Sequence, residues 1–470
     1  MLRQLFRTRT LTHEDYAGSG LRKCLSAFDL TLLGIGCIIG TGIFVLTGVA
    51  AATQAGPAIV LSYVAAGVAC TCAALAYAEL AAAVGGCGSA YGYSYAAFGE
   101  FFAWVIGWDL ILEYGFATAA VANGWAGYFH DFLASVGLGL PEMLTKAPRH
   151  GGLVNLPAAG IILVLMVLLV IGVKQSARMN AVMVAIKVAT VFAFIAAAVG
   201  HVDAANWDPF LPFGWYEELA NGSKVGVFAA ASLVFFAYIG FDAVSTAAEE
   251  AANPQRDLPI GILASLGICT VLYIIVSAIM TGVVPYSELN VSSPASHALL
   301  LVGARTAATI VSAGVIVGLV SVMLVLYYGL TRIIFAMSRD GLISGMFAAV
   351  WPVTQTPARV IILCGVAMAV IAGFIPLGEL AELVNIGTLA AFVLVCLGVV
   401  VLRIRRPDLK RSFRTPWSPL VPLVGAASCS YLIYTLPQIT WLRFIGWLAI
   451  GIVIYFSYSI RHSRLDSASS

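Results

Sequence analysis

Long apolar runs alternate with short polar breaks along almost the whole chain. Most runs are about 20 residues or longer, which is the length an α-helix needs to cross the hydrocarbon core of a bilayer. The pattern predicts about twelve membrane helices, near 28–54, 57–84, 98–128, 155–173, 178–200, 224–249, 258–284, 305–337, 358–376, 380–402, 417–436 and 441–460. The rest of the chain consists of short loops and two tails, so any function has to be built within the helix bundle.

The composition excludes a soluble protein. Of the 470 residues, 61% are hydrophobic and 10% are charged, whereas a soluble domain carries about 25% charged residues. So few charges cannot cover the surface of a chain this long. The net charge of +2 gives no reason to expect a nucleic-acid partner.

The basic residues are divided unevenly between the two sides of the predicted bundle. With the N-terminus inside, 19 of the 25 Lys and Arg residues fall in inside segments, five fall in outside segments and one, Lys187, falls within a span. Cytoplasmic loops carry the excess of Lys and Arg. The protein is therefore expected in the cell membrane, with its N-terminal tail, 1–27, and its C-terminal tail, 461–470, both in the cytoplasm.

Cysteine and histidine give no sign of a metal or cofactor site. The nine cysteines fall mostly inside apolar runs and lack the paired spacing of a zinc site. All six histidines lie in tails or loops, which makes a histidine proton relay improbable. No metal, cofactor or disulfide framework is expected.

The first predicted helix contains an unusual concentration of glycine, in the stretch GIGCIIGTGIF with Gly34, Gly36, Gly40 and Gly42. Glycine costs about 1 kcal/mol relative to alanine inside a helix, so the helix is easily broken here. An unwound stretch at membrane depth persists only where it is buried in protein or lines a cavity. Close helix packing at small residues is the alternative explanation. A dinucleotide-binding loop is disfavoured because the preceding strand is missing.

The sixth predicted helix has a matching interruption, in the stretch FFAYIGFDAVSTAAEE with Gly240 and Asp242. Two interrupted helices five spans apart are the pattern of transporters built from two inverted five-helix repeats. In such proteins the substrate site lies at the interface of the repeats. The pair of breaks therefore favours a binding site over simple packing.

The chemistry of the exposed backbone indicates a zwitterionic ligand. The breaks would expose NH groups at Gly40, Thr41 and Gly42, and carbonyls near Ile38, Phe236, Ala237 and Ile239. The NH groups at the start of a half-helix attract an anion such as a carboxylate, and the carbonyls attract a cation such as an ammonium. A free L-amino acid offers both groups.

Ionisable side chains deep in a membrane span are functional candidates by default, and four such candidates are Lys187, Glu113, Asp109 and Asp242. Lys187 is a candidate for proton coupling, or alternatively a structural donor to carbonyls of the unwound first helix. Glu113, and less strongly Asp109 four residues before it, could lie near the binding cavity; the alternative is hydrogen bonding between helices. Asp242 could contact the ligand or cap the second half of the sixth helix.

Several of these motifs together resemble the amino acid permeases of the amino acid-polyamine-organocation superfamily. They are GIGCIIGTGIF, FFAYIGFDAVSTAAEEAANPQRDLPIGI and TRIIFAMSRDGLIS, and the chain is most similar to bacterial homologues of the cationic amino acid transporter family. The resemblance covers about residues 21–461. It implies an all-α, LeuT-type fold with repeats at 28–200 and 224–402 and two further helices at 417–460.

The resemblance also implies roles for the residues at the breaks. Gly40, Thr41 and Gly42 would hold the substrate carboxylate, and the carbonyls of Ile38, Phe236, Ala237 and Ile239 would hold its amine. Lys187 matches the lysine that takes the place of sodium in proton-coupled members. Aromatic and apolar residues of the sixth and eighth helices suit an apolar substrate side chain.

The expected function is proton-coupled import of L-amino acids by alternating access, with a preference for neutral substrates. An exchanger, a uniporter of cationic amino acids and a non-transporting sensor of the same fold remain open. The expected partners are an L-amino acid, a proton and the lipid bilayer, and a small accessory subunit is left open. An enzyme is disfavoured because no catalytic or metal-binding pattern occurs, and a channel is disfavoured by an occluding central site.

Overall fold

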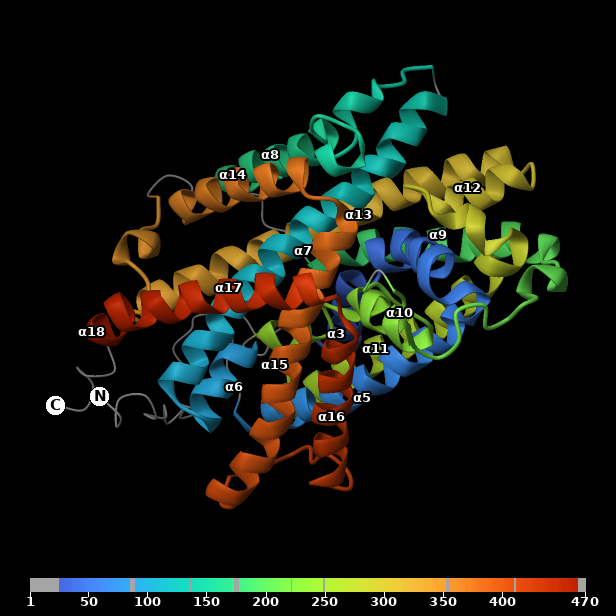
Figure 1. The fold of residues 1–470 in the computed structure, drawn as a ribbon. Coiled ribbons are helices and arrows are strands. Elements are labelled where there is room, and N and C mark those ends of the chain that lie inside the picture. Colours follow the sequence, from blue (N-terminus) through green and yellow to red (C-terminus); the bar gives the residue numbers. More distant parts are fainter. Residues whose placement is uncertain are drawn as a thin grey trace.

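The structure is a computed structural model that describes residues 25–84, 89–135, 137–172, 177–220, 222–247, 250–351, 356–409 and 411–463, except for the side chains of 89, 177, 178 and 246. Most of the predicted N-terminal tail and residues 464–470 of the predicted C-terminal tail lie outside the described residues. Figure 1 shows the arrangement of the helices.

The described chain is almost entirely helical, as predicted. Apart from loops, it adds only a hairpin of β1 (Glu217–Glu218) and β2 (Lys224–Val225). The α-helices are α3 (Ala27–Ile38), α4 (Thr47–Ala50), α5 (Ile59–Ala83), α6 (Ser89–Ala97), α7 (Glu100–Ser135), α8 (Leu156–Ile171), α9 (Ala177–Ala198), α10 (Val227–Val234), α11 (Pro254–Val283), α12 (Pro294–Leu301), α13 (Arg305–Arg339), α14 (Ala358–Phe374), α15 (Leu377–Arg405), α16 (Leu420–Thr435), α17 (Gln438–Ile454) and α18 (Ile460–His462).

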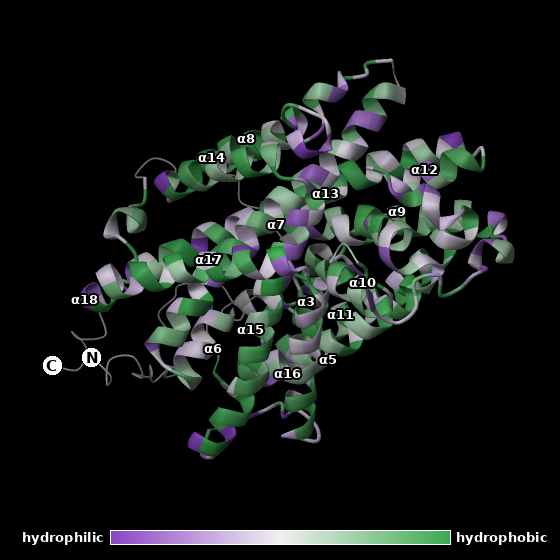
Figure 2. Cartoon of the chain, viewed as in Figure 1, coloured by the Kyte–Doolittle hydropathy of each residue, from purple (hydrophilic) through white to green (hydrophobic). Residues whose placement is uncertain are grey.

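Within the described residues, eight helical stretches are long and apolar enough to cross a bilayer. They are Gly42–Ala83, Glu100–Ser135, Met179–His201, Val227–Ser245, Pro254–Val283, Arg305–Arg339, Leu377–Arg405 and Gln438–His462. Shorter apolar helices occupy Ala27–Ile38, Leu156–Ile171, Ala358–Phe374 and Leu420–Thr435. Hydrophobic residues dominate the surfaces of the outer helices α8, α14 and α17 (Figure 2), as expected where helices face lipid.

Local sequence signals set the ends of several helices. The Ser26 hydroxyl accepts a hydrogen bond from the backbone N–H of Asp29, and the Asp29 carboxylate accepts one from the backbone N–H of Ser26. This reciprocal capping box starts α3. Asn155 caps α8 by accepting from the N–H of Ala158, and Gly172 ends that helix in the left-handed conformation.

The helices pack around the segments that the sequence predicts to be broken. The long α7 packs against α13 and α15, while α3 packs against α11 and α9. α16 packs against α15 and α5, and α17 packs against α15 and α7. Two short helices, α6 and α12, lie in connections where no element was predicted, because neither forms an apolar run long enough to stand out in the sequence.

Candidate substrate-binding site

The first break separates α3 from the half-helix that follows it. α3 ends at Ile38, and Ile39 is extended with φ −71° and ψ 103°. Helical geometry returns at Thr41, and a π-helical turn covers Gly42–Leu46 before α4. Because the first NH groups of a helix have no preceding carbonyl to bond within it, the segment from Gly40 to Gly42 starts a new helical N-terminus in the interior of the protein.

The second break follows α10. A tight 3₁₀ turn at Phe235–Tyr238 leads to Ile239, which is extended with φ −61° and ψ 133°. Gly240 then takes φ +118°, a conformation open to glycine and strained for other residues. The Asp242 carboxylate accepts a hydrogen bond from the N–H of Gly240 at 3.3 Å, which ties the start of the second half-helix to the break.

The two breaks lie directly against each other. A Cβ atom added at Gly42 would lie 2.3 Å from Cα of Ala237, and one added at Gly240 would lie 2.8 Å from Cβ of Cys37. These two glycines are therefore needed for close packing between the broken segments. Gly40 differs, since its added Cβ would meet only a methyl group of Val322 at an ordinary 3.6 Å. Packing alone does not explain the glycine at position 40.

A tyrosine of α11 joins the two breaks. The Tyr273 hydroxyl lies 2.7 Å from the carbonyl oxygen of Ile38 and 2.9 Å from that of Ala237, and both act as acceptors. The ring packs beside those of Tyr63 and Tyr238, with centroids 5.4 and 5.5 Å away. These carbonyls are two of those that the sequence assigns to a ligand amine, and each retains a second lone pair.

Of the remaining predicted carbonyls, that of Phe236 accepts the N–H of Ile239 at 3.3 Å, which closes the turn between them. Sequence reasoning could place the break but could not tell which carbonyls a local turn would occupy.

Lys187 of α9 is buried, with 1% of its surface exposed. Its Nζ donates to the carbonyl oxygen of Gly36, in the last turns of α3. Gly318 of α13 lies against its stem, since a Cβ added there would be 2.9 Å from Cγ of Lys187. The structure thus contains the hydrogen bond to the first broken helix that the sequence offered as a structural role.

Several buried polar atoms near the broken helices have no hydrogen-bond partner among the described residues. They are Thr41 Oγ1, Glu113 Oε1, both carboxylate oxygens of Asp109, and Asn385 Oδ1. Thr41 packs against Gly124 of α7, which leaves no room for a side chain at position 124. Buried polar groups are normally satisfied, so these atoms indicate places where water, a proton or a ligand would bind.

The carboxyl groups on α7 face the second broken helix. Glu113 is close enough to Asp242 and Asp109 to interact with both electrostatically. The neighbouring Tyr114 donates to the Asp242 carboxylate at 3.4 Å. Glu113 therefore lies beside the second break.

Comparison with known proteins decides the family. A sequence profile described as amino acid permease matches residues 25–457. The chain belongs to the amino acid permease family. It is 50% identical over 467 residues to the methylthioribose transporter of Bacillus subtilis (strain 168), and 49% identical over 470 residues to the branched-chain amino acid permease BcaP of the same organism. Both matches cover 98% of this chain and 99% of the relative.

A more distant relative of this permease is the human cationic amino acid transporter 4, which is 37% identical over 395 residues, covering 83% of this chain and 61% of the relative. The comparisons confirm the superfamily that the motifs resemble. The family and its members are transporters rather than enzymes, and the apolar helices make the permease a multi-pass membrane protein.

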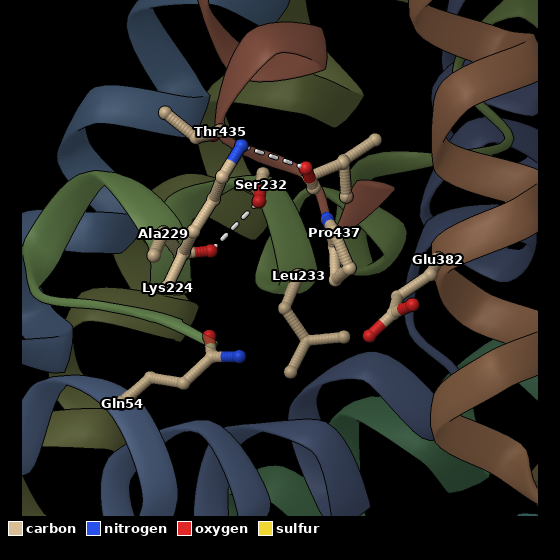
Figure 3. Close-up of a pocket in the computed structure, with 9 residues that line it drawn as sticks. Gln54, Lys224, Ala229, Ser232, Leu233, Glu382, Thr435 and Pro437 are labelled. Carbon is tan, nitrogen blue, oxygen red and sulfur yellow. Dashed lines mark hydrogen bonds between the residues drawn. The ribbon is translucent and has the colours of Figure 1, made fainter. Parts of the chain in front are cut away.

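A small pocket of the permease lies beside α10, away from the contact between the breaks (Figure 3). Its volume of about 10 Å³ gives room for a single water molecule. Lys224 lies at one wall and donates to the carbonyls of Tyr434 and Leu436. Gln54 and Glu382 line the same pocket, and Gln54 Oε1 has no partner among the described residues.

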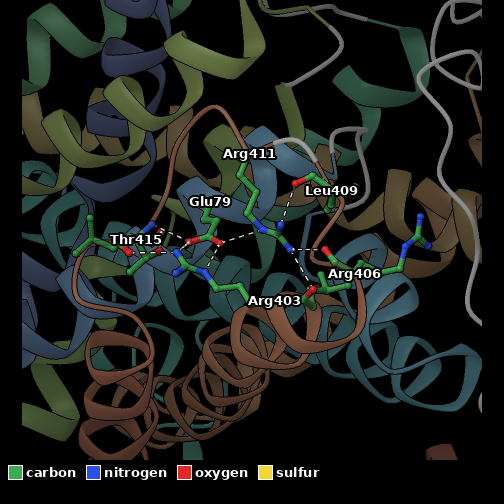
Figure 4. A network of polar contacts seen from close by, with 8 residues as sticks. Glu79, Arg403, Arg406, Leu409, Arg411 and Thr415 are labelled. Carbon is green, nitrogen blue, oxygen red and sulfur yellow. Dashed lines mark hydrogen bonds and ion pairs between the residues drawn. The ribbon is translucent and has the colours of Figure 1, made fainter.

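The permease also contains a buried ion-pair network at the end of α5 (Figure 4). Glu79, with 1% of its side chain exposed, accepts from Nε and Nη2 of Arg403 at 2.9 and 2.7 Å and pairs with Arg411 at 3.4 Å. The backbone N–H of Thr415 donates to it at 2.7 Å. The network joins α5 to the end of α15 and to the loop before α16.

Proposed function

We propose that the permease imports neutral L-amino acids together with protons, by alternating access around the two helix breaks. The observation that carries this proposal is the direct contact of the breaks, where Gly42 of the new helix start packs against Ala237 and the carbonyls of Ile38 and Ala237 lie at one tyrosine hydroxyl. Donors and acceptors in one place suit a zwitterion. We also infer that the long and the shorter apolar helices make twelve spans, of which the first ten form two inverted repeats.

In the proposed complex, the substrate carboxylate binds the NH groups of Gly40, Thr41 and Gly42. Glycine at position 40 lets a carboxylate approach the backbone closely, and the unpartnered Thr41 hydroxyl would add a donor. The ammonium binds the free lone pairs of the carbonyls at Ile38 and Ala237, with those at Phe236 and Ile239 nearby. Glu113 supplies a carboxyl group that can accept a hydrogen bond behind the second break.

The proposed coupling acts through the hydrogen bond from Lys187 to Gly36. A protonated Lys187 holds α3 against α9, because a charged donor makes a stronger bond than a neutral one. Loss of the proton weakens this bond and releases the segment that carries the first break. The proton and the substrate thus both act on the C-terminal end of α3.

The branched-chain aliphatic amino acids are the proposed substrates. The apolar surroundings of the breaks support this proposal. So do two relatives named as branched-chain amino acid permeases, from Bacillus subtilis at 49% identity and from Lactococcus lactis at 34% identity. Methylthioribose is a second candidate, because a transporter named for it is 50% identical to this chain. The cell membrane is the proposed location, with both termini in the cytoplasm.

Proteoliposomes provide the test. Uptake of labelled leucine is measured with and without an imposed acid-outside pH gradient, for the natural protein and for Lys187→Met, which keeps the length of the stem and removes the ammonium. We expect the gradient to drive accumulation in the natural protein and to have little effect on the variant. Equal uptake with and without the gradient would contradict proton coupling.

The same vesicles separate the alternatives. Uptake that requires internal amino acid indicates an exchanger, and binding without any flux indicates a sensor. Competition by unlabelled valine, arginine and methylthioribose identifies the substrate class. Strong competition by arginine alone would contradict the neutral preference, and strong competition by methylthioribose alone would favour the second candidate.

A further inference from the structure

A second, larger cavity lies at the ends of α14, α15 and α17. Its volume is about 300 Å³, at the lower limit of cavities that hold small ligands. Arg149 from the loop before α8, Glu379 from the first turn of α15 and Arg443 from α17 are its charged residues. The rest of the lining is apolar, with Phe116 and Phe374 as its largest members.

The lining of this cavity carries two guanidinium groups and one carboxylate. Arg149 Nη1 contacts Glu379 Oε1 at 2.6 Å, and Arg443 Nη2 contacts Glu379 Oε2 at 2.6 Å. Glu382, one turn further along α15, lines the other pocket, accepts there from Thr440 at 2.7 Å and is close enough to Arg443 to interact with it electrostatically. Each guanidinium carries five N–H donors, so both retain donors for an additional anion.

The surroundings of the cavity indicate a lipid rather than a soluble anion. Phe374 has 51% of its surface exposed and Leu442, next to Arg443, has 66%. Exposed apolar side chains on the outer helices of a membrane protein face acyl chains. A ligand here would have its anionic group at the arginines and apolar atoms against Phe116 and Phe374.

We propose that this cavity binds the phosphate group of an anionic phospholipid. The fork geometry of arginine suits phosphate oxygens, and basic pockets between membrane helices are known to hold lipid headgroups. The bound lipid would bridge the loop before α8 to α17 through Arg149 and Arg443. The site is separate from the proposed substrate site and does not depend on the proposed transport function.

Native mass spectrometry of the full-length protein tests the proposal. The purified protein is mixed with phosphatidylglycerol, and bound lipid is compared for the natural chain, Arg149→Ala and Arg443→Gln. We expect roughly tenfold weaker retention in each variant, the cost of one charge-assisted hydrogen bond. Lys146→Ala is the matched control, because Lys146 lies in the same loop, pairs with Glu142 at 2.7 Å and does not line the cavity.

Two further probes identify the source of the anion. Phosphatidylcholine should bind more weakly than phosphatidylglycerol, because its ammonium group cancels the phosphate charge. Inorganic phosphate alone should not raise the unfolding temperature as phosphatidylglycerol does. Equal retention of phosphatidylglycerol by the natural chain and Arg149→Ala would overturn the proposal, as would equal stabilisation by inorganic phosphate. Arg149 is 65% exposed at its side chain, so this variant is expected to fold even if Arg443→Gln does not.

Discussion

At the scale of single residues, Tyr273 holds the two broken segments in contact. Its hydroxyl is shared between the carbonyls of Ile38 and Ala237, which belong to different half-helices. Any substrate amine that binds these carbonyls has to share them with this hydroxyl. The tyrosine therefore links substrate binding to the distance between the breaks.

Tyr273→Phe should lower the stability of the empty protein by about 1 kcal/mol, the typical net contribution of one hydrogen bond. The measurement is thermal unfolding in detergent, with and without substrate. Tyr434→Phe is the control, because Tyr434 is exposed on α16 and its ring, which the variant keeps, contacts Lys224. An unfolding temperature equal to that of the natural protein would show that Tyr273 does not join the breaks.

The contrast between Lys187 and Tyr273 explains what a sequence can reveal about single residues. A charge in the middle of an apolar run is rare, so Lys187 stands out from the sequence pattern alone. A tyrosine in such a run is common, and its hydroxyl matters only if the helix turns it inward. That rotation of α11 depends on packing against α3 and α5, which the sequence pattern does not specify.

At the scale of elements, the contact between the breaks depends on the glycine at position 42 more than on the glycine at position 40. Gly42→Ala would place a methyl group 2.3 Å from the Ala237 backbone, and a backbone cannot move aside as a flexible side chain can. We expect a loss of about 1–3 kcal/mol, typical of overpacking. Gly40→Ala meets only Val322 at 3.6 Å and should unfold near the natural temperature. Thermal unfolding of the two variants side by side measures this, and equal effects would contradict the packing role of Gly42.

The Glu79 network makes a second prediction about elements. Glu79→Ala leaves Arg403 and the mostly buried Arg411 without their carboxylate, and breaking a buried pair in this way costs about 3–5 kcal/mol. The variant should unfold at a clearly lower temperature. Arg406→Ala removes an exposed pair with Asp408 at 3.7 Å and should change stability by less than about 1 kcal/mol. Similar unfolding temperatures for both variants would show that the network does not stabilise the fold.

Apolar runs indicated where the long helices lie, because helix length and hydrophobicity are both visible in the sequence. The third predicted span, 98–128, is nevertheless too short, since α7 continues to Ser135. Its last turns include Asp131 and are less apolar, so the apolar run in the sequence ends before the helix does. The breaks were visible because glycine clusters interrupt apolar runs, whereas the contact between the breaks needed the three-dimensional structure.

At the scale of the whole molecule, the basic residues sort into two separate groups. Arg149 and Arg443, both assigned outside from the sequence, meet at Glu379. Arg403 and Arg411, both assigned inside, meet at Glu79. In each group, arginines that are assigned to the same side of the membrane from the sequence thus meet at one glutamate. The positive-inside rule then assigns the Glu79 end to the cytoplasm.

Reporter fusions test this orientation. Alkaline phosphatase, which is active only outside the cytoplasm, is fused after Leu140 in the loop before α8 or after Leu409 in the loop before α16. We expect high activity for the first fusion and low activity for the second, with the opposite result for a fluorescent protein that folds only in the cytoplasm. The reverse pattern would place the Glu379 cavity in the inner leaflet. It would also mean that the excess of arginine and lysine does not set the topology of this chain.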